Sequence, residues 1–167
     1  MLLSKSLKQF ITSAGKLSDY SGQYGSVENF LTWLFRTNGS DSKLLARALG
    51  DAGDYKLPGF GIPLAAEALK NIGYDVAKPD RHINRAVGCF GMVEFRRWHD
   101  RSGWETPPQP TVAELMRVMR AMEELSREVR QSVTFVDNAV WLLCARSGLH
   151  MSNDKLAALA AKKEMKG

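Results

Sequence analysis

The chain has 167 residues and a formal net charge of +5, with 44% hydrophobic and 25% charged residues. These proportions are those of a folded globular protein, and no apolar run approaches the roughly 20 residues that a membrane-spanning helix needs. The length is sufficient for one domain with a proper hydrophobic core. The basic balance agrees with an anionic partner such as nucleic acid, although many proteins of similar charge bind none.

The cysteines and the first residues argue against a metal site and a targeting segment. Cys89 and Cys144 are far apart and lack the CxxC or Cys-His spacing of zinc and iron–sulfur sites. We therefore expect two buried thiols in a reducing cytosol and no bound metal. The N-terminal segment indicates an amphipathic helix rather than a signal peptide, because four apolar residues recur at helical spacing: Leu3, Leu7, Phe10 and Ile11.

The N-terminal part of the chain predicts a series of helices. The first covers residues 3–14, and residues 19–25, rich in Ser, Gly and Tyr, are expected to form a loop. Ser26 then caps a helix over residues 27–35 whose apolar side chains cover most of its circumference. Such a helix is expected to be buried, with Trp33 in the core.

The next segment predicts two helices that flank a glycine-rich turn. After a turn at residues 37–40, Asp41 or Ser42 caps a helix whose apolar residues are Leu44, Leu45, Ala48 and Leu49. The following helix covers residues 62–72, with small alanines that permit close packing, and Gly73 is its C-cap.

The C-terminal half also reads as helical, without any convincing strand. A helix is expected to start at residues 80–86, and residues 89–98 are expected to continue in helical or broken-helical form. Residues 101–110 contain three prolines and form a loop. Three further helices are predicted: one that opens on the capping box at Thr111–Glu114 and reaches about Val129, one over residues 135–146, and one that Ser152 caps. We therefore predict an all-α protein.

The turn Leu57-Pro58-Gly59-Phe60-Gly61 is the first candidate binding site. Two helices joined by a tight glycine-containing turn expose backbone N–H groups at a helix N-terminus, where they bind a phosphate without reading sequence. Gly59 and Gly61 are expected to supply conformational freedom and close approach. Pro63 falls in the first turn of the following helix, where a missing N–H group is tolerated.

These residues, and others downstream, resemble the helix-hairpin-helix motif of a DNA glycosylase superfamily that includes endonuclease III. The turn is followed by Ala65 and Leu69 as in that motif. Asp80, in the segment Asp80-Arg81-His82-Ile83, stands about twenty residues after the hairpin, like that family's catalytic aspartate. Phe135-Val136-Asp137 and then Trp141-Leu142-Leu143 are similar to the family's closing helix.

The resemblance covers residues 42–148, apart from an insertion at residues 101–130. On this basis we expect one domain over residues 1–167, glycosylase-like in fold. It would contain a hairpin core at 42–90, a long helix in the insertion at 101–130, and closing helices at 134–164.

The resemblance implies an N-glycosylase that removes a damaged or mispaired base from double-stranded DNA in base-excision repair. Asp80 would be the catalytic carboxylate, stabilising the oxocarbenium character that develops on the sugar or activating water. The implied DNA-binding residues are Leu57, Gly59, Phe60, Gly61, Arg81 and His82. The protein would be cytoplasmic, and associated with the nucleoid when bound to DNA.

Departures from the family pattern limit the expected chemistry. Family members that also cut the strand carry a lysine where this chain has Pro63, so we expect a monofunctional enzyme without β-lyase activity. The cysteines of the family's iron–sulfur cluster are missing. A monovalent cation bound by hairpin carbonyls is the cofactor that the resemblance allows.

Other interpretations stay open at this point. Asp80 alone is an ordinary helix N-cap, and a non-catalytic DNA-binding protein that kept the hairpin is the main alternative function. A helical protein-interaction domain is a third. No counterpart to the family's wedge segment is found. The candidates for base-pocket or wedge residues each have packing or loop anchoring as the alternative role: Tyr20, Tyr24, Trp98, His99 and Trp104.

Overall fold

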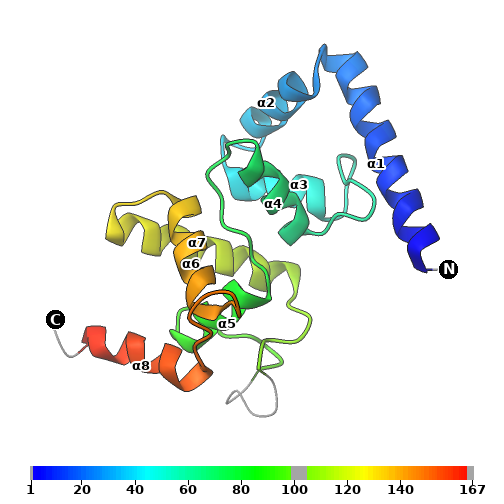
Figure 1. Cartoon of the computed structure of the whole chain (residues 1–167). Coiled ribbons are helices and arrows are strands. Elements are labelled where there is room, and N and C mark those ends of the chain that lie inside the picture. The colour runs from blue at the N-terminus through cyan, green and yellow to red at the C-terminus, as the bar shows by residue number, and fades with distance from the viewer. Residues whose placement is uncertain (1, 99–104, 165–167) are drawn as a thin grey trace. The chain divides into compact units, whose positions relative to one another are not determined.

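The computed structural model describes residues 2–98 and 105–164, and these residues form eight helices and no strand (Figure 1). The predicted all-α class is thereby confirmed. The chain divides into two compact units, Met1–Tyr74 and Asp75–Gly167. Within the described residues, four helices belong to each unit. None of the helices described is long and apolar enough to cross a bilayer.

The first unit contains α1 (Leu2–Tyr24), α2 (Val27–Thr37), α3 (Ser42–Gly50) and α4 (Ile62–Asn71). Consecutive helices pack against each other, and α3 and α4 form the closest pair. Two of the predicted caps are confirmed: Ser26 Oγ accepts the Asn29 amide, and Asp41 Oδ1 accepts the amides of Lys43 and Leu44. Gly73 follows α4 with a positive φ of 98°. It completes the predicted C-terminal turn.

Helix α1 is longer than expected, and the loop predicted at residues 19–25 is wrong. The helix continues to Tyr24 because its tyrosines join an aromatic cluster of the first unit. The Tyr20 ring stacks on Phe30 with centroids 4.1 Å apart, and the Tyr24 ring lies 4.9 Å from Trp33. This long-range packing outweighs the local preference of Ser and Gly for a loop.

The face of α1 that packs is also different from its apolar face. Leu7, Phe10 and Ile11 are exposed, whereas the buried or half-buried positions are Gln9, Ser13, Lys16, Leu17, Tyr20, Ser21 and Tyr24. Ser13 donates a hydrogen bond to the Pro58 carbonyl at 2.6 Å. The helix therefore contacts its own unit through polar and aromatic side chains together with Leu17, and the spacing of Leu7, Phe10 and Ile11 did not indicate its orientation.

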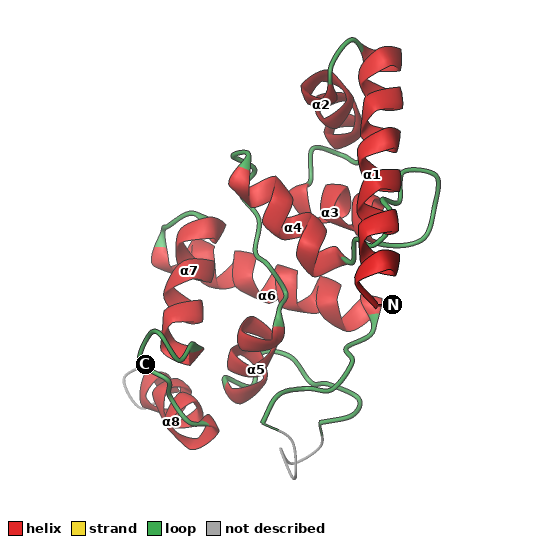
Figure 2. Cartoon of the chain, turned by 45° about the vertical axis from the view of Figure 1, so that its right-hand side comes forward, coloured by secondary structure: helices red, strands yellow, loops and turns green. Residues whose placement is uncertain are grey.

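The second unit contains α5 (Arg81–Cys89), α6 (Val112–Val129), α7 (Val133–Cys144) and α8 (Asn153–Glu164). Helix α5 packs against the other three (Figure 2). The core includes Ile83 and Val87 of α5, Val118 and Met122 of α6, Val136 and Val140 of α7 and Leu156 of α8. Both cysteines are buried free thiols, as expected.

The expected helical continuation over residues 89–98 is wrong. Helix α5 ends at Cys89, and Gly91 turns the chain with a φ of 72°. The returning segment places Trp98 against α5, where a Cβ atom at Gly88 would lie 2.2 Å from the Trp98 ring. Only glycine fits under the indole, so Trp98 is a core residue of this unit rather than a base-pocket residue.

Two helix starts in the second unit depend on carboxylates. The predicted capping box is present, since the Thr111 hydroxyl accepts the Glu114 amide while Glu114 Oε2 accepts the Thr111 amide. Helix α7 begins at Val133, earlier than predicted, because Asp75 accepts the amides of Val133 at 3.1 Å and Thr134 at 2.7 Å. The local N-cap of α7 is Ser132, whose hydroxyl accepts the Phe135 amide at 3.1 Å, and the distant Asp75 satisfies two further amides of this helix start.

Candidate functional site

The predicted hairpin turn is held in one conformation by backbone hydrogen bonds. The Phe60 amide donates to the Leu57 carbonyl at 3.0 Å, and Gly59 has a φ of 79°, which is the pattern of a type II turn with Pro58 at its second position. Leu57 is buried, and its amide donates to the Leu49 carbonyl at 3.0 Å. The amides of Leu57 and Phe60 are therefore engaged within the unit.

Gly61 differs from Gly59 in its backbone conformation. Its φ of −104° and ψ of 170° are extended values that any residue adopts, so the expected conformational freedom is needed at Gly59 alone. Gly61 is exposed and is the N-cap of α4, but with no side chain it provides no cap hydrogen bond. The first amides of a helix have no intrahelical partner. At this end of α4, Gly61 and Leu64 are exposed, whereas Ile62 is buried and Pro63 has no N–H group.

The ends of α3 and α4 are in close contact beside the turn. A Cβ atom at Gly50 would lie 2.5 Å from the Ile62 nitrogen, so only glycine permits this approach. The Lys56 ammonium donates to the Gly50 carbonyl at 2.6 Å and also to the Phe60 carbonyl. Burial lowers the Lys56 pKa. Lys56 thus links the last turn of α3 to the residue before Gly61.

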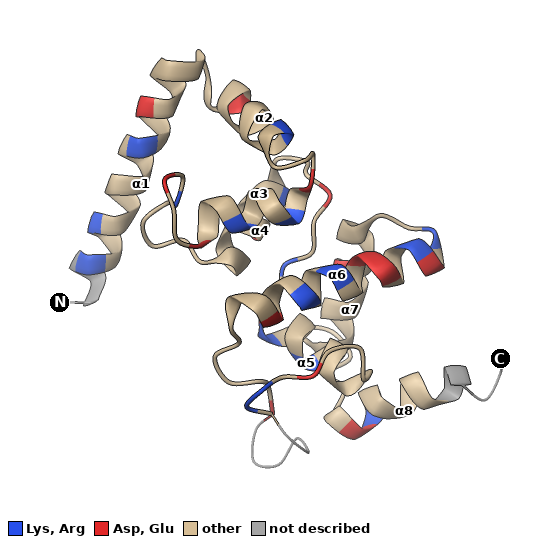
Figure 3. Ribbon diagram, turned by 180° about the vertical axis from the view of Figure 1, so that it is seen from behind, with Lys and Arg blue, Asp and Glu red and all other residues tan. Residues whose placement is uncertain are grey.

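Helix α1 lies along one side of the same turn. Lys16 Nζ donates to the carbonyls of Asp54 and Lys56, and Tyr20 donates to Asp54 as well. A Cβ atom at Gly59 would lie 3.1 Å from Gln9. One side of the turn is therefore occupied by α1. Figure 3 shows charges of both signs on α1 and on α6; α1 carries Lys5, Lys8 and Lys16 besides Asp19.

Asp80 belongs to the second unit and is the N-cap of α5. Its Oδ1 atom accepts the amides of His82 at 2.8 Å and Ile83 at 3.1 Å. Its Oδ2 atom lies 3.8 Å from Lys78 Nζ, and the side chain is 18% exposed. The Lys78 amide in turn donates to Oδ1 of the buried Asp137 at 3.0 Å. The segment before α5 is thus held by α7, and the Asp80 carboxylate has a defined orientation.

The two basic residues after Asp80 have different surroundings. Arg81 is exposed. The His82 ring lies edge-on to Trp141, with centroids 5.9 Å apart. Burial lowers the His82 pKa, although the Asp80 charge acts in the opposite direction. His82 is therefore neutral near pH 7, and Arg81 is the cation of this pair.

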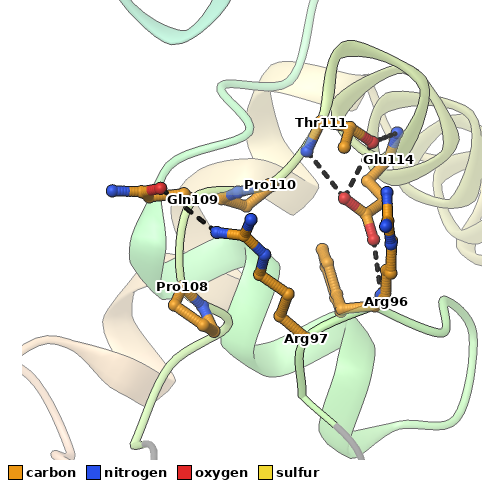
Figure 4. Close-up of a pocket in the computed structure, with 8 residues that line it drawn as sticks. Arg96, Arg97, Pro108, Gln109, Pro110, Thr111 and Glu114 are labelled. Atoms are coloured by element: carbon orange, nitrogen blue, oxygen red, sulfur yellow. Dashed lines mark hydrogen bonds between the residues drawn. The ribbon is translucent and has the colours of Figure 1, made fainter.

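Another carboxylate of the second unit is purely structural. Glu114 is buried beside a small pocket of about 150 Å³ whose wall includes Arg96, Arg97 and the segment Pro108–Thr111 (Figure 4). Burial acts to raise its pKa, but hydrogen bonds from the Arg96 amide and from Thr111 outweigh burial and lower it. All these partners hold the chain around α6, so Glu114 is not a catalytic candidate.

The remaining candidate residues have structural roles or fall outside the description. Tyr20 and Tyr24 belong to the aromatic cluster of the first unit, and Trp98 belongs to the core of the second. His99 and Trp104 lie outside the described residues. No group of three metal-binding side chains occurs in the described parts of the chain.

Comparison with known proteins adds no assignment. No protein-family model matches this chain. No solved structure matches it significantly either.

Proposed function

We propose that this protein binds double-stranded DNA through the turn before α4 and releases a damaged or mispaired base, with Asp80 as the catalytic carboxylate. The proposal is supported mainly by the fixed orientation of the Asp80 carboxylate. One oxygen is held by two amides, while the other has only the Lys78 ammonium at 3.8 Å among the described residues. A carboxylate held in place before the reaction stabilises positive charge that develops on a sugar.

The α4 N-terminus supplies the grip on DNA in this proposal. The helix dipole and the amides of the exposed Gly61 and Leu64 attract a phosphate, and the missing side chain of Gly61 allows a backbone to approach. This recognition reads no base, which suits an enzyme that must search along DNA. Pro63 holds the position that the resemblance gives to a Schiff-base lysine, so we expect base release without strand cleavage.

The hairpin is expected to work without a bound monovalent cation. Three carbonyls of the turn already have partners: Leu57 accepts the Phe60 amide, Pro58 accepts Ser13, and Phe60 accepts the Lys56 ammonium. The Lys56 side chain thus supplies a positive charge next to the turn. DNA affinity should be equal in potassium and lithium salts of the same ionic strength.

The decisive experiment measures base release. Purified protein is incubated with duplexes that carry a panel of lesions, and alkali afterwards converts abasic sites into strand breaks. The Asp80→Asn variant keeps the helix cap, because asparagine caps as well as aspartate, but loses the negative charge. We expect a loss of about a hundredfold or more in its release rate.

The chain provides a matched control. Asp41 caps α3 through the same pair of amide contacts in the first unit. Asp41→Asn removes the same charge from an equivalent cap and should leave base release unchanged. Equal activity of the Asp80→Asn variant and the wild type would rule out the catalytic assignment.

A non-catalytic DNA-binding protein is the second candidate, and one observation favours it. The cap that Asp80 makes on α5 is by itself a sufficient reason for an aspartate at this position. This candidate predicts salt-sensitive, sequence-independent duplex binding without base release from any lesion. Gly61→Glu should weaken the binding by repulsion, whereas Gly61→Ala should preserve the fold, since the nearest atom to its Cβ is 3.7 Å away. No duplex binding even at low salt would instead favour a protein-interaction domain.

A further inference from the structure

A second possible site lies in the second unit, apart from Asp80 and the hairpin. It is a pocket of about 500 Å³ in front of the N-terminus of α8. Its wall contains Arg85 of α5, Glu105 of the segment before α6, and four consecutive residues that lead into α8: His150, Met151, Ser152 and Asn153. Three separate parts of the sequence thus meet around one cavity.

Arg85 is the unusual member of this wall. It is 2% exposed, although arginine is rarely buried without a strong partner. Its Nη2 atom donates to the Cys144 carbonyl at 3.2 Å, which links α5 to the end of α7. Its Nη1 atom donates to Glu105 at 3.4 Å, which is long for a charge-assisted hydrogen bond. A buried guanidinium needs a well-placed anion to offset its lost hydration.

Glu105 is a weak and replaceable partner for that charge. Its side chain is 73% exposed, and exposed ion pairs contribute little because water competes for both groups. Its carbonyl also accepts a hydrogen bond from Asn153 Nδ2 at 3.2 Å. Asn153 Oδ1, in the same wall, is buried and has no donor among the described residues. Glu105 is therefore a weakly bound partner of the buried Arg85 guanidinium. It also contacts Asn153, whose buried Oδ1 atom is unsatisfied.

We propose that this pocket binds a phosphate group, which replaces the Glu105 carboxylate on Arg85. The planar guanidinium matches the oxygens of a phosphate with two parallel hydrogen bonds. The N-terminus of α8 adds the amides of Asn153 and Asp154 and the helix dipole. The Ser152 hydroxyl already accepts the Lys155 amide at 3.4 Å, and the Asp154 carboxylate in the first turn acts against the dipole. A hydrogen phosphate or a sugar phosphate also carries a hydroxyl group, which can donate to Asn153 Oδ1 once Glu105 has moved. The contact between Arg85 and Cys144 stays in place.

The ligand class is a small phosphate, either free or attached to a nucleoside. Both share the chemistry that Arg85 and α8 recognise. This site shares no residue with the hairpin or with Asp80, so it can be present whether or not the protein releases bases.

The test is a titration of the full chain at constant ionic strength and pH, followed by the amide NMR signals of Ser152 to Lys155. Inorganic phosphate replaces chloride in one arm, and deoxyadenosine monophosphate is the ligand in the other. We expect saturable shifts at these amides in the wild type in at least one arm. Equal affinity in both arms assigns recognition to the phosphate alone, and tighter binding of the nucleotide adds a contact to the nucleoside.

The Glu105→Gln variant gives the most specific result, because it removes the competing charge from an exposed position. We expect its phosphate affinity to rise by roughly two- to fivefold. Glu124→Gln is the matched control, since it makes the same charge change on an exposed residue of α6 and should leave the affinity unchanged. Arg85→Lys keeps the positive charge but loses the two parallel N–H donors of the guanidinium, and should weaken phosphate binding by about tenfold or more.

Two outcomes would overturn the proposal. One is the absence of saturable shifts at residues 152–155 in both the wild type and Glu105→Gln, and the other is an equal affinity gain in Glu105→Gln and Glu124→Gln. Neither outcome depends on whether the Arg85→Lys variant folds.

Discussion

The N-termini of α4 and α5 carry the two parts of the proposed function, and they differ in how their first amides are satisfied. At α5, Asp80 accepts two amides and closes the helix end. At α4, Gly61 has no side chain, and the end stays open. In α2, α3, α6 and α7 the structure also shows a side-chain cap, so α4 is the exception among these helices. An uncapped end is less stable, but it is available to an external anion.

The difference also separates two roles for the same type of backbone group. Amides that a protein satisfies internally fix the position of a side chain, as they do for Asp80. Amides that it leaves open can bind a ligand. The hundredfold loss of base release expected for Asp80→Asn is the largest effect of this contrast. Further substitutions at the two helix ends should have smaller effects.

The largest further effect is expected when the α4 end is made like the α5 end. Gly61→Asp places a capping carboxylate on a backbone that already has the extended conformation of a cap. Duplex affinity should fall by about tenfold or more through repulsion of phosphate, while the free energy of unfolding should rise by a few tenths of a kcal/mol. Filter binding and urea denaturation measure the two quantities. Unchanged DNA affinity in a stabilised variant would show that this helix end does not bind phosphate.

Gly59 and Gly61 should respond differently to alanine. Gly59→Ala forces a side chain into a φ of 79° and toward Gln9 at 3.1 Å, so it should destabilise the first unit by about 1–2 kcal/mol. Gly61→Ala has a negative φ and room for its Cβ atom, and should cost only about 0.5 kcal/mol, because alanine is a poorer N-cap than glycine. Urea denaturation of the two variants compares them directly. Similar losses would mean that the turn does not have the conformation described.

The cap at α5 should have a measurable structural value apart from any chemistry. Asp80→Ala leaves the His82 and Ile83 amides without their acceptor, and should reduce the free energy of unfolding by about 1 kcal/mol. Asp80→Asn should lose much less. If denaturation shows the two variants to be equally stable, the cap hydrogen bonds contribute nothing, and the orientation of Asp80 is then not set by α5.

The smallest effect concerns His82. Because its folded pKa is below the ordinary value of 6.5, protons bind the unfolded state more readily. The resulting stability is present above about pH 6.5 and is lost as the pH falls through that value toward the folded pKa. Thermal denaturation between pH 7.5 and pH 5.5 should show this loss in the wild type and a reduced loss in His82→Gln. An equal loss in the wild type and in His82→Gln would contradict this prediction.

Most helix positions, and the turn that carries the candidate site, were predictable because their signals are local. The helix starts are indicated by the residue types alone, because each capping side chain bonds an amide within three residues of it. This holds for Ser26, for Asp80 and for the pair Thr111 and Glu114. The burial of Leu57, the conformation of Gly61 and the environment of Arg85 were not predictable. Each depends on a partner or backbone angle that sequence spacing does not encode.

The sequence by itself therefore determined the all-α class, most of the helix caps and the glycine turn, since these follow from hydrogen bonds between neighbours in the chain. Tertiary structure decided which face of α1 is packed, where α5 ends and which amides remain open. These features depend on contacts across long sequence separations, such as Ser13 with Pro58, Trp98 with Gly88 across the returning segment, and Arg85 with Cys144. At such positions the free energy of tertiary packing exceeds the local preference for helix or loop. Buried polar groups there also need hydrogen-bond partners, which can be distant in the sequence.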